Sequence, residues 1–103
     1  MVGIEIRVDV RPEKRDEFLQ AVEALQAMTR RDREACVSQN IYQERGHQTR
    51  FLWVERWAER ANLEARLESD PFRALLGAVR VLGVVSDMEV VEAADWPDAD
   101  SSF

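Results

Sequence analysis

Hydrophobic and polar residues alternate strictly over residues 2–10, which predicts a β-strand with one buried face. Glu5, Arg7 and Asp9 share the polar face of this strand. The next apolar residues have helical spacing, and Pro12 suits the first position of that helix. We expect the helix to end at 30–33. Its buried stripe is predicted to consist of Phe18, Leu19, Val22, Leu25 and Met28.

Two further strands are predicted over residues 35–43 and 51–57, and the segment 44–49 between them contains Gly46. Short extended runs joined through such a segment are typical of a β-hairpin. In the first of these strands, Val37 and Ile41 are expected on one face. The other face is expected to carry Cys36, Ser38, Asn40 and Tyr42.

The strand over 51–57 is the most unusual stretch of the chain, because alternate positions place two indoles and one carboxylate on one face. That face carries Phe51, Trp53, Glu55 and Trp57. A short helix with Leu63 and Leu67 should follow, and Asp70 is predicted to cap a second helix. A last strand is predicted over 84–92. The inward positions of the second helix are expected to be Phe72, Leu75, Leu76 and Val79.

The resulting order of elements is β-α-β-β-α-β, with the second helical region divided in two. This order is typical of a ferredoxin-like α+β fold, in which helices cover one face of a four-stranded antiparallel sheet. We expect one domain over residues 1–92 and a loose acidic tail over 93–103. The uncovered face of the sheet should carry Glu5, Arg7, Asp9, Asp87 and Glu89.

Composition narrows the choice of partners. The 103 residues contain 14 Lys and Arg against 20 Asp and Glu, giving a net charge of −6 without a basic cluster. Contact with a phosphate backbone requires such a cluster, so we expect no nucleic-acid partner. No apolar run reaches membrane-spanning length, and we expect a cytoplasmic protein without membrane contact. Cys36 is the single cysteine, so no intrachain disulfide is possible.

Several classes of chemistry have no support in the sequence. The four glycines are scattered, which excludes a phosphate-binding glycine loop. One His and one Cys make a metal cluster implausible, and His47 falls in the predicted hairpin loop, where it is expected to be exposed. Carboxylates occur on strand faces, but no spacing singles out an acid–base pair.

An apolar pocket between sheet and helices is the candidate site that remains. Glu55 lies between two indoles and must find a partner, or have a raised pKa, if it is buried. Arg66 is either that partner or a side chain that extends to water. The aromatic residues either line a pocket or simply form the core. The residues concerned are Phe51, Trp53, Trp57, Tyr42 and Phe72, with Glu55, Asn40 and Arg66 as polar groups.

The Glu-x-Trp at the strand end (Glu55 and Trp57), the short helix after it and the Ser-x-x-Phe from Ser69 to Phe72 resemble the antibiotic biosynthesis monooxygenase (ABM) family. The resemblance extends from the first strand to Val91. It implies a homodimer in which two sheets meet face to face and close an α/β barrel. It also implies oxygenation of polycyclic phenols, anthrones or quinols without metal, flavin or another cofactor.

The resemblance carries over to individual residues only in part. Trp57 stands at the position of the oxygenases' pocket tryptophan, and Glu55 matches the glutamate before it. Trp53 replaces an Asn that those enzymes often carry, and Arg66 replaces a His. Arg66 cannot act as a base near neutral pH, but it can bind a phenolate or carboxylate. Leu76 falls near the iron-ligand position of the haem-degrading branch, so we do not expect haem degradation.

The leading hypothesis is a cofactor-independent monooxygenase acting on a hydroxylated aromatic or a quinol. One alternative is a non-catalytic dimer of the same fold, binding a small molecule or serving in assembly. Another is an isomerase or degradation enzyme for a small carbonyl metabolite. The open or closed state of the space between sheet and helices distinguishes the first two. The hypothesis assigns catalytic roles to Trp57, Arg66 and Glu55, and substrate binding to Trp53, Asn40, Tyr42 and Phe72.

Overall fold

The computed structural model describes residues 1–29 and 36–92, with side chains described for 1–27 and 36–92. The chain forms β1 (Val2–Val10), a 3-10 turn (Pro12–Lys14), α1 (Arg15–Thr29), β2 (Cys36–Gln43), β3 (Arg50–Trp57), α2 (Arg60–Glu68), α3 (Asp70–Leu82) and β4 (Gly83–Glu92). Every strand expected from the alternation is present, and the bounds differ from the prediction by one residue or less. The helical region after β3 is divided in two, as predicted.

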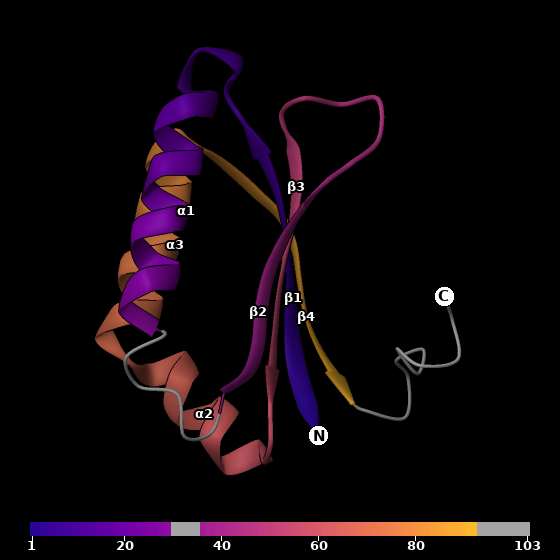
Figure 1. The fold of residues 1–103 in the computed structure, drawn as a ribbon, viewed down its shortest axis with the longest axis vertical. Helices are drawn as coiled ribbons and strands as arrows, with labels where there is room; N and C mark the ends of the chain where they lie inside the picture. Colours follow the sequence, from indigo (N-terminus) through magenta and orange to yellow (C-terminus); the bar gives the residue numbers. More distant parts are fainter. Residues whose placement is uncertain (30–35, 93–103) are drawn as a thin grey trace.

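The four strands form one antiparallel sheet in the order β2-β3-β1-β4. Helices α1 and α3 lie side by side over one face of this sheet, and α2 lies near the end at which β3 terminates (Figure 1). None of the described helices covers the opposite face. This arrangement confirms the predicted ferredoxin-like α+β fold.

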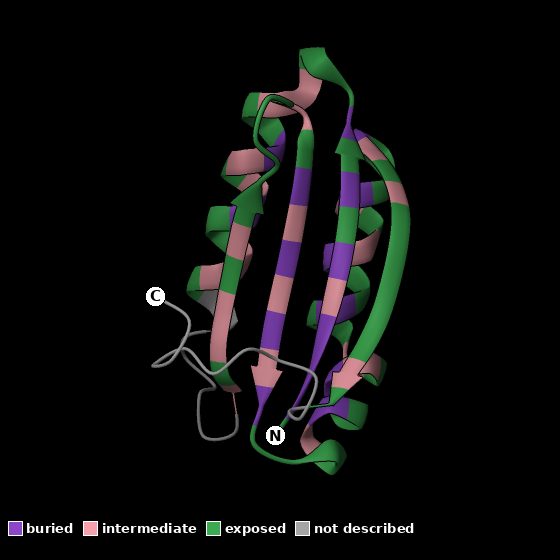
Figure 2. Ribbon diagram, turned by 90° about the vertical axis from the view of Figure 1, so that its right-hand side faces the viewer, coloured by how far each residue is buried: buried purple, intermediate pink, exposed green. Residues whose placement is uncertain are grey.

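The core lies between the sheet and α1 and α3. All five apolar side chains of β1 are buried, as are Phe51, Trp53 and Trp57 of β3, and buried positions alternate with accessible ones along both strands (Figure 2). The helices contribute Phe18, Val22, Leu75 and Val79 to the same cluster. Each large apolar side chain buried in this way stabilises the fold by roughly 1.5–3 kcal/mol.

A β-bulge at the start of β2 changes which side chains face the core. Cys36 pairs with Trp57 and Ser38 pairs with Arg56, which leaves Val37 without a partner in the ladder. Val37 is therefore 52% exposed, whereas Cys36 and Ile41 pack against the core. The predicted division of this strand was wrong at Cys36 and Val37, because one extra residue reverses the alternation on its N-terminal side.

The cap of α3 also differs from the prediction. Ser69, rather than Asp70, is the N-cap, since its Oγ accepts a hydrogen bond from the backbone N–H of Phe72 at 3.3 Å. Asp70 and Pro71 occupy the first turn of the helix, where a carboxylate favours the helix dipole and proline needs no hydrogen-bond partner. The N-cap of α3 therefore lies one residue earlier than expected.

Three predictions concern parts of the chain outside the described residues. These are the acidic tail over 93–103, the helix end at 30–33 and the burial of the Met28 side chain. The other predicted stripe positions of α1 agree with the structure. Phe18 and Val22 are buried, and Leu19 and Leu25 pack against the core from its edge.

The uncovered face carries the charges that the alternation predicted. Glu5 lies opposite Glu89 on β4, and Arg7 lies opposite Asp87. Leu52 and Val54 of β3 are half-buried on the same face. Like charges directly opposite each other on neighbouring strands are unfavourable, so this face is not optimised for the isolated chain.

Candidate functional site

Glu55 is the centre of a hydrogen-bond network on the helix-covered face of the sheet. Its carboxylate is completely buried and accepts four hydrogen bonds. The indole Nε1 of Trp53 donates to Oε2 at 2.8 Å, and that of Trp57 donates to Oε1 at 3.1 Å. The two tryptophans lie two residues before and after Glu55, so the period of the strand places both indoles beside its carboxylate.

Arg66 completes the network from α2. Its Nε donates to Oε1 of Glu55 at 3.0 Å and its Nη2 donates to Oε2 at 2.8 Å, which is the bidentate geometry of a strong arginine–carboxylate pair. Its side chain is 6% exposed, so it is the buried partner of Glu55 rather than a side chain that extends to water. The guanidinium also lies over the ring of Phe72, 5.3 Å from its centroid.

Ser69 ties the arginine's helix to the next one. Its Oγ donates to the backbone carbonyl of Arg66 at 2.6 Å and also accepts from the N–H of Phe72. One hydroxyl therefore joins the end of α2 to the start of α3. It holds the backbone of Arg66 and of Phe72, the residue whose ring lies against the guanidinium.

The chemistry open to this network follows from its hydrogen bonds. A carboxylate offers about four lone-pair sites, and all four of those on Glu55 accept protein N–H groups. Glu55 therefore cannot accept a proton from a bound molecule without losing one of these bonds. Arg66 uses two of its five N–H groups for Glu55, and it has the chemistry to bind an anionic oxygen as well.

The space between sheet and helices beside Trp53 is nearly filled. Within the described part of the chain, a cavity of about 10 Å³ lies there, bounded by side chains of β1, α1 and α3. A single water molecule needs about this much room. Trp53 is 3% exposed and occupies the space beside Glu55. The cavity beside Trp53 does not hold an aromatic substrate unless neighbouring side chains move.

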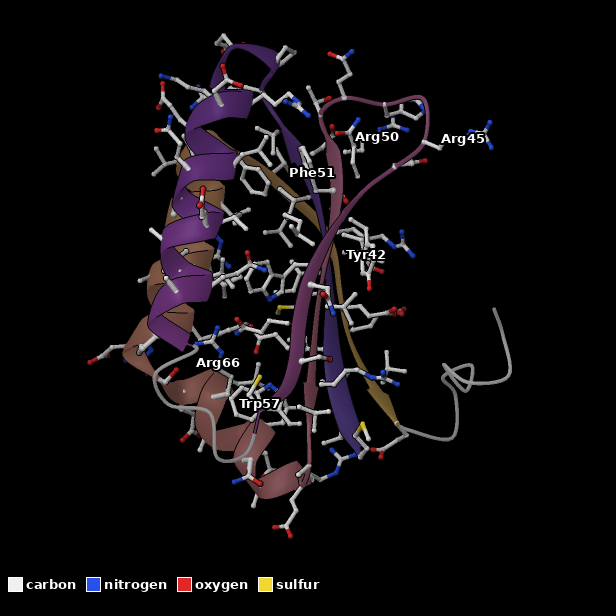
Figure 3. All side chains as sticks on the ribbon, in the orientation of Figure 1. Tyr42, Arg45, Arg50, Phe51, Trp57 and Arg66 are labelled. Carbon is white, nitrogen blue, oxygen red and sulfur yellow. The ribbon has the colours of Figure 1, made fainter. Side chains whose placement is uncertain are left out.

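The structure brings together five of the seven predicted site residues and separates the other two. Tyr42 lies on the opposite side of the sheet from Trp57 and Arg66 (Figure 3). Asn40 shares the face of Tyr42, because the two are alternate residues of β2. Their predicted place in a pocket between sheet and helices was therefore wrong. The five residues that do lie together are Trp53, Glu55, Trp57, Arg66 and Phe72.

Tyr42 instead lines a larger, open hollow of about 430 Å³ on the uncovered face, near the β2–β3 hairpin. Arg50 and Arg7 also line it. Arg50 is within 3.7 Å of Asp9 and 4.0 Å of Glu44, so its charge is compensated by neighbours within the hollow. These pairs are about half exposed, and exposed ion pairs contribute little to stability.

Gln39 belongs to the inner layer, although the sequence analysis did not select it. It is the Cα partner of Glu55 across β2 and β3, and it shares its face with Ile41. Its Nε2 is buried without a hydrogen-bond partner in the described part of the chain. The signal available in the sequence was the alternation itself, since Val37 and Ile41 were expected on one face of this strand and Gln39 lies between them at the same period.

The described residues contain neither a cluster of metal-ligating side chains nor a membrane-spanning helix. No three or more His, Cys, Asp or Glu side chains lie close enough together there to hold a metal ion. Over the same residues, no helix combines the length and apolar character needed to cross a membrane.

Solved structures with this fold are numerous. A mutant of the cofactor-independent oxygenase SnoaB from Streptomyces nogalater superposes with a TM-score of 0.77 at 18% identity, over 89% of this chain and 91% of that one. Rv0793 from Mycobacterium tuberculosis gives 0.77 at 20% identity over 95% and 97%. An antibiotic biosynthesis monooxygenase gives 0.73 at 22% identity over 88% and 94%. No curated protein matches the chain significantly in sequence.

These superpositions show the fold: a ferredoxin-like α+β arrangement around a four-stranded antiparallel sheet. The sequence itself matches the family model for antibiotic biosynthesis monooxygenases over residues 1–77. The chain belongs to that family. The resemblance identified from Glu55, Trp57 and the Ser69–Phe72 motif is thereby confirmed.

Proposed function

We propose that this protein is a monooxygenase of the ABM type that oxidises a hydroxylated aromatic or a quinol without a cofactor. The observation that carries the proposal is the Glu55–Arg66 network with its two indoles, in a chain of this family. Apolar walls with a few fixed polar groups are typical of sites for small aromatic molecules. In the proposed site, Arg66 holds an anionic substrate oxygen, and Glu55 keeps Arg66 and both indoles in place.

The reaction is balanced without a prosthetic group. An anthrone that loses a proton becomes an electron-rich phenolate, which can pass electrons to oxygen directly. One oxygen atom of O₂ then enters the ring carbon as the carbonyl of an anthraquinone, and the other leaves as water with the two hydrogens of the original CH₂. The protein contributes orientation and exclusion of water rather than redox equivalents.

The proposed entry to the site lies at Trp57 and Arg66. Trp57 and Arg66 are each 7% exposed, whereas Glu55 is completely buried. Movement of Trp57 would widen the layer and leave Arg66 facing the opened space. Phe72 and Trp53 would then form its apolar walls. Asn40 and Tyr42 have no place in this site, because they lie on the other face of the sheet.

Oxygen-electrode measurements with a panel of anthrones and hydroquinones test this activity. We expect oxygen uptake and formation of the quinone by the wild-type protein, and a rate lower by about tenfold or more for Arg66→Lys, the effect of one lost hydrogen bond to the substrate oxygen. Lysine keeps the positive charge but lacks the planar guanidinium that can bind Glu55 and a substrate oxygen together. Val81→Ala, at a position of α3 that is 68% exposed, is the control and should keep the wild-type rate. A flat trace across the whole panel would contradict the proposal.

A second candidate function is favoured by the closed layer. A cavity of about 10 Å³ does not hold an aromatic ring, and Trp53 fills the space beside Glu55. This observation favours a non-catalytic protein of the same fold, which binds a small molecule or serves in assembly. Binding of quinones without oxygen uptake would support this second function.

We further propose that the protein is a homodimer in which the uncovered faces of two sheets meet. The half-buried Leu52 and Val54 support this, as do the opposed Glu5 and Glu89, which lack a cation in the described chain and could receive one from a second copy. In such a dimer the hollow near Tyr42 would lie at the interface.

Light scattering at micromolar concentration should give about twice the 11.9 kDa mass of one chain. Val54→Arg introduces a charge at the middle of the uncovered face, so we expect it to give the single-chain mass. The matched control is Val81→Arg on the exposed side of α3, which should remain dimeric. A monomeric wild-type protein would rule out the dimer.

A further inference from the structure

Gln39 carries a buried polar group that takes no part in the hydrogen-bond network of Glu55. Its backbone lies directly opposite Glu55 in the β2–β3 ladder, so its side chain points to the same side of the sheet as Trp53 and Trp57. Its Nε2 is buried, yet it has no hydrogen-bond partner in the part of the chain that the structure describes. An amide group in this state is unfavourable by roughly the cost of a lost hydrogen bond.

The residue opposite Gln39 in the ladder has no free acceptor site. The carboxylate of Glu55 already accepts from Trp53, from Trp57 and twice from Arg66, which uses all four of its lone-pair sites. An additional donor would have to displace one of these bonds. The Nε2 group of Gln39 therefore takes no part in the Glu55 network, and we expect its acceptor to lie outside that network.

We infer that Gln39 is a substrate-positioning residue whose Nε2 donates a hydrogen bond to a carbonyl or phenolate oxygen of the bound aromatic molecule. This inference rests on the proposed function, because it uses the same layer and the same class of substrate. Arg66 and Gln39 are both neighbours of Glu55, one from α2 and the other from β2. A substrate oxygen beside this carboxylate would meet one cationic and one neutral donor.

The position of Gln39 in the sheet supports access by such a molecule. β2 is an edge strand, so Gln39 lies at the margin of the inner layer and not beneath its centre. Cys36 and Ile41, on the same side of β2, are partly buried apolar neighbours. A neutral donor between apolar side chains selects for a planar molecule that offers an acceptor oxygen at its edge, because a hydrocarbon would leave the amide unpaired.

The test compares two ligands that differ only in their acceptor oxygens. Binding of 9,10-anthraquinone and of anthracene, which share one carbon skeleton and of which the quinone has no open position for thiol addition, is measured by quenching of tryptophan fluorescence, for wild type and for Gln39→Met, which keeps the length of the side chain. We expect the quinone to bind about tenfold more weakly to the variant, the size of one neutral hydrogen bond, while anthracene binding changes less than about twofold. Gln20→Met, at an exposed position of α1, is the matched control and should change neither affinity.

Thermal unfolding without ligand provides a second readout. Removing an unpaired buried amide should leave the Tm of Gln39→Met unchanged or raise it, so quinone affinity should fall without a loss of stability. A fall in Tm of several degrees would show that Gln39 is satisfied in the free protein, for example by an internal water, and would overturn the inference. Equal weakening of both ligands, or of neither, would also overturn it.

These outcomes are separate from those of the proposed activity. The binding comparison does not require turnover, so a flat oxygen trace would contradict the monooxygenase proposal while selective loss of quinone binding still supported the role of Gln39. Conversely, oxygen uptake that Gln39→Met leaves unchanged in both kcat and KM would count against Gln39 alone.

Discussion

Replacement of Arg66 by Met is expected to lower the free energy of unfolding by about 3–5 kcal/mol, the usual cost of leaving one member of a buried ion pair without its partner. The substitution removes two of the four hydrogen bonds to Glu55 while the carboxylate stays completely buried. The indoles of Trp53 and Trp57 cannot neutralise its charge. Since a domain of this size is stable by only about 5–15 kcal/mol, the loss is a large fraction of the total.

Urea denaturation followed by circular dichroism measures this effect, and Arg66→Lys refines it. Lysine keeps the charge but cannot form the two parallel N–H···O bonds of the guanidinium, so we expect it to recover only part of the stability. Arg73→Met is the matched control, because Arg73 is an exposed arginine of α3 whose nearest carboxylate, on Asp70, is 3.9 Å away. A loss below about 1 kcal/mol for Arg66→Met, the range of an exposed pair, would show that the ion pair does not organise the layer.

Replacement of Gly83 by Ala is expected to be the second severe change. A Cβ at this position would overlap the backbone carbonyl oxygen of Asp9 and lie 2.7 Å from the Cα of Val10. Both contacts are with the backbone of β1, the strand that pairs with β4, so neither can be relieved by turning a side chain. We expect a loss of about 1–3 kcal/mol or more, as for other overpacked positions.

Gly77→Ala provides the control for this substitution within the same helix-to-strand region. Gly77 lies inside α3, and a Cβ there would have nothing within 4 Å. Alanine is a better helix former than glycine, so this variant should be more stable by about 0.5–1 kcal/mol. Opposite signs for the two glycines in the same denaturation assay are the expected result. If both variants changed the stability by the same amount, the close backbone contacts of Gly83 would not be the reason for glycine at that position.

The Glu55 network also bears on how the protein would work. Four hydrogen bonds to one carboxylate fix both indoles and the guanidinium, and a guanidinium held in this way needs no rearrangement when a substrate oxygen arrives beside Arg66. The same bonds oppose opening of the layer. In the proposed enzyme the outer side chain, Trp57, therefore has to move while the Glu55–Arg66 pair stays intact.

The sequence by itself determined the elements and their order. A strand that buries one face and a helix that buries one stripe each give the apolar residues a characteristic spacing along the sequence. The alternation over 2–10, the aromatic strand over 51–57 and the divided helix after it were all predicted within a residue. The Glu-x-Trp and Ser-x-x-Phe motifs also identified the family. These features depend on residues close together in the sequence, so they can be predicted without knowledge of the tertiary packing.

Only the tertiary structure decided what the aromatic face does. Whether Arg66 reaches Glu55 or water depends on where α2 lies relative to β3, and no local sequence pattern specifies that position. The bulge at Val37 and the pairing of Gln39 with Glu55 depend on β3, a partner strand separated by a hairpin. Closure of the layer by Trp53 depends on the combined volumes of three elements. Such properties arise from contacts between distant parts of the chain, and the period of any single element does not contain them.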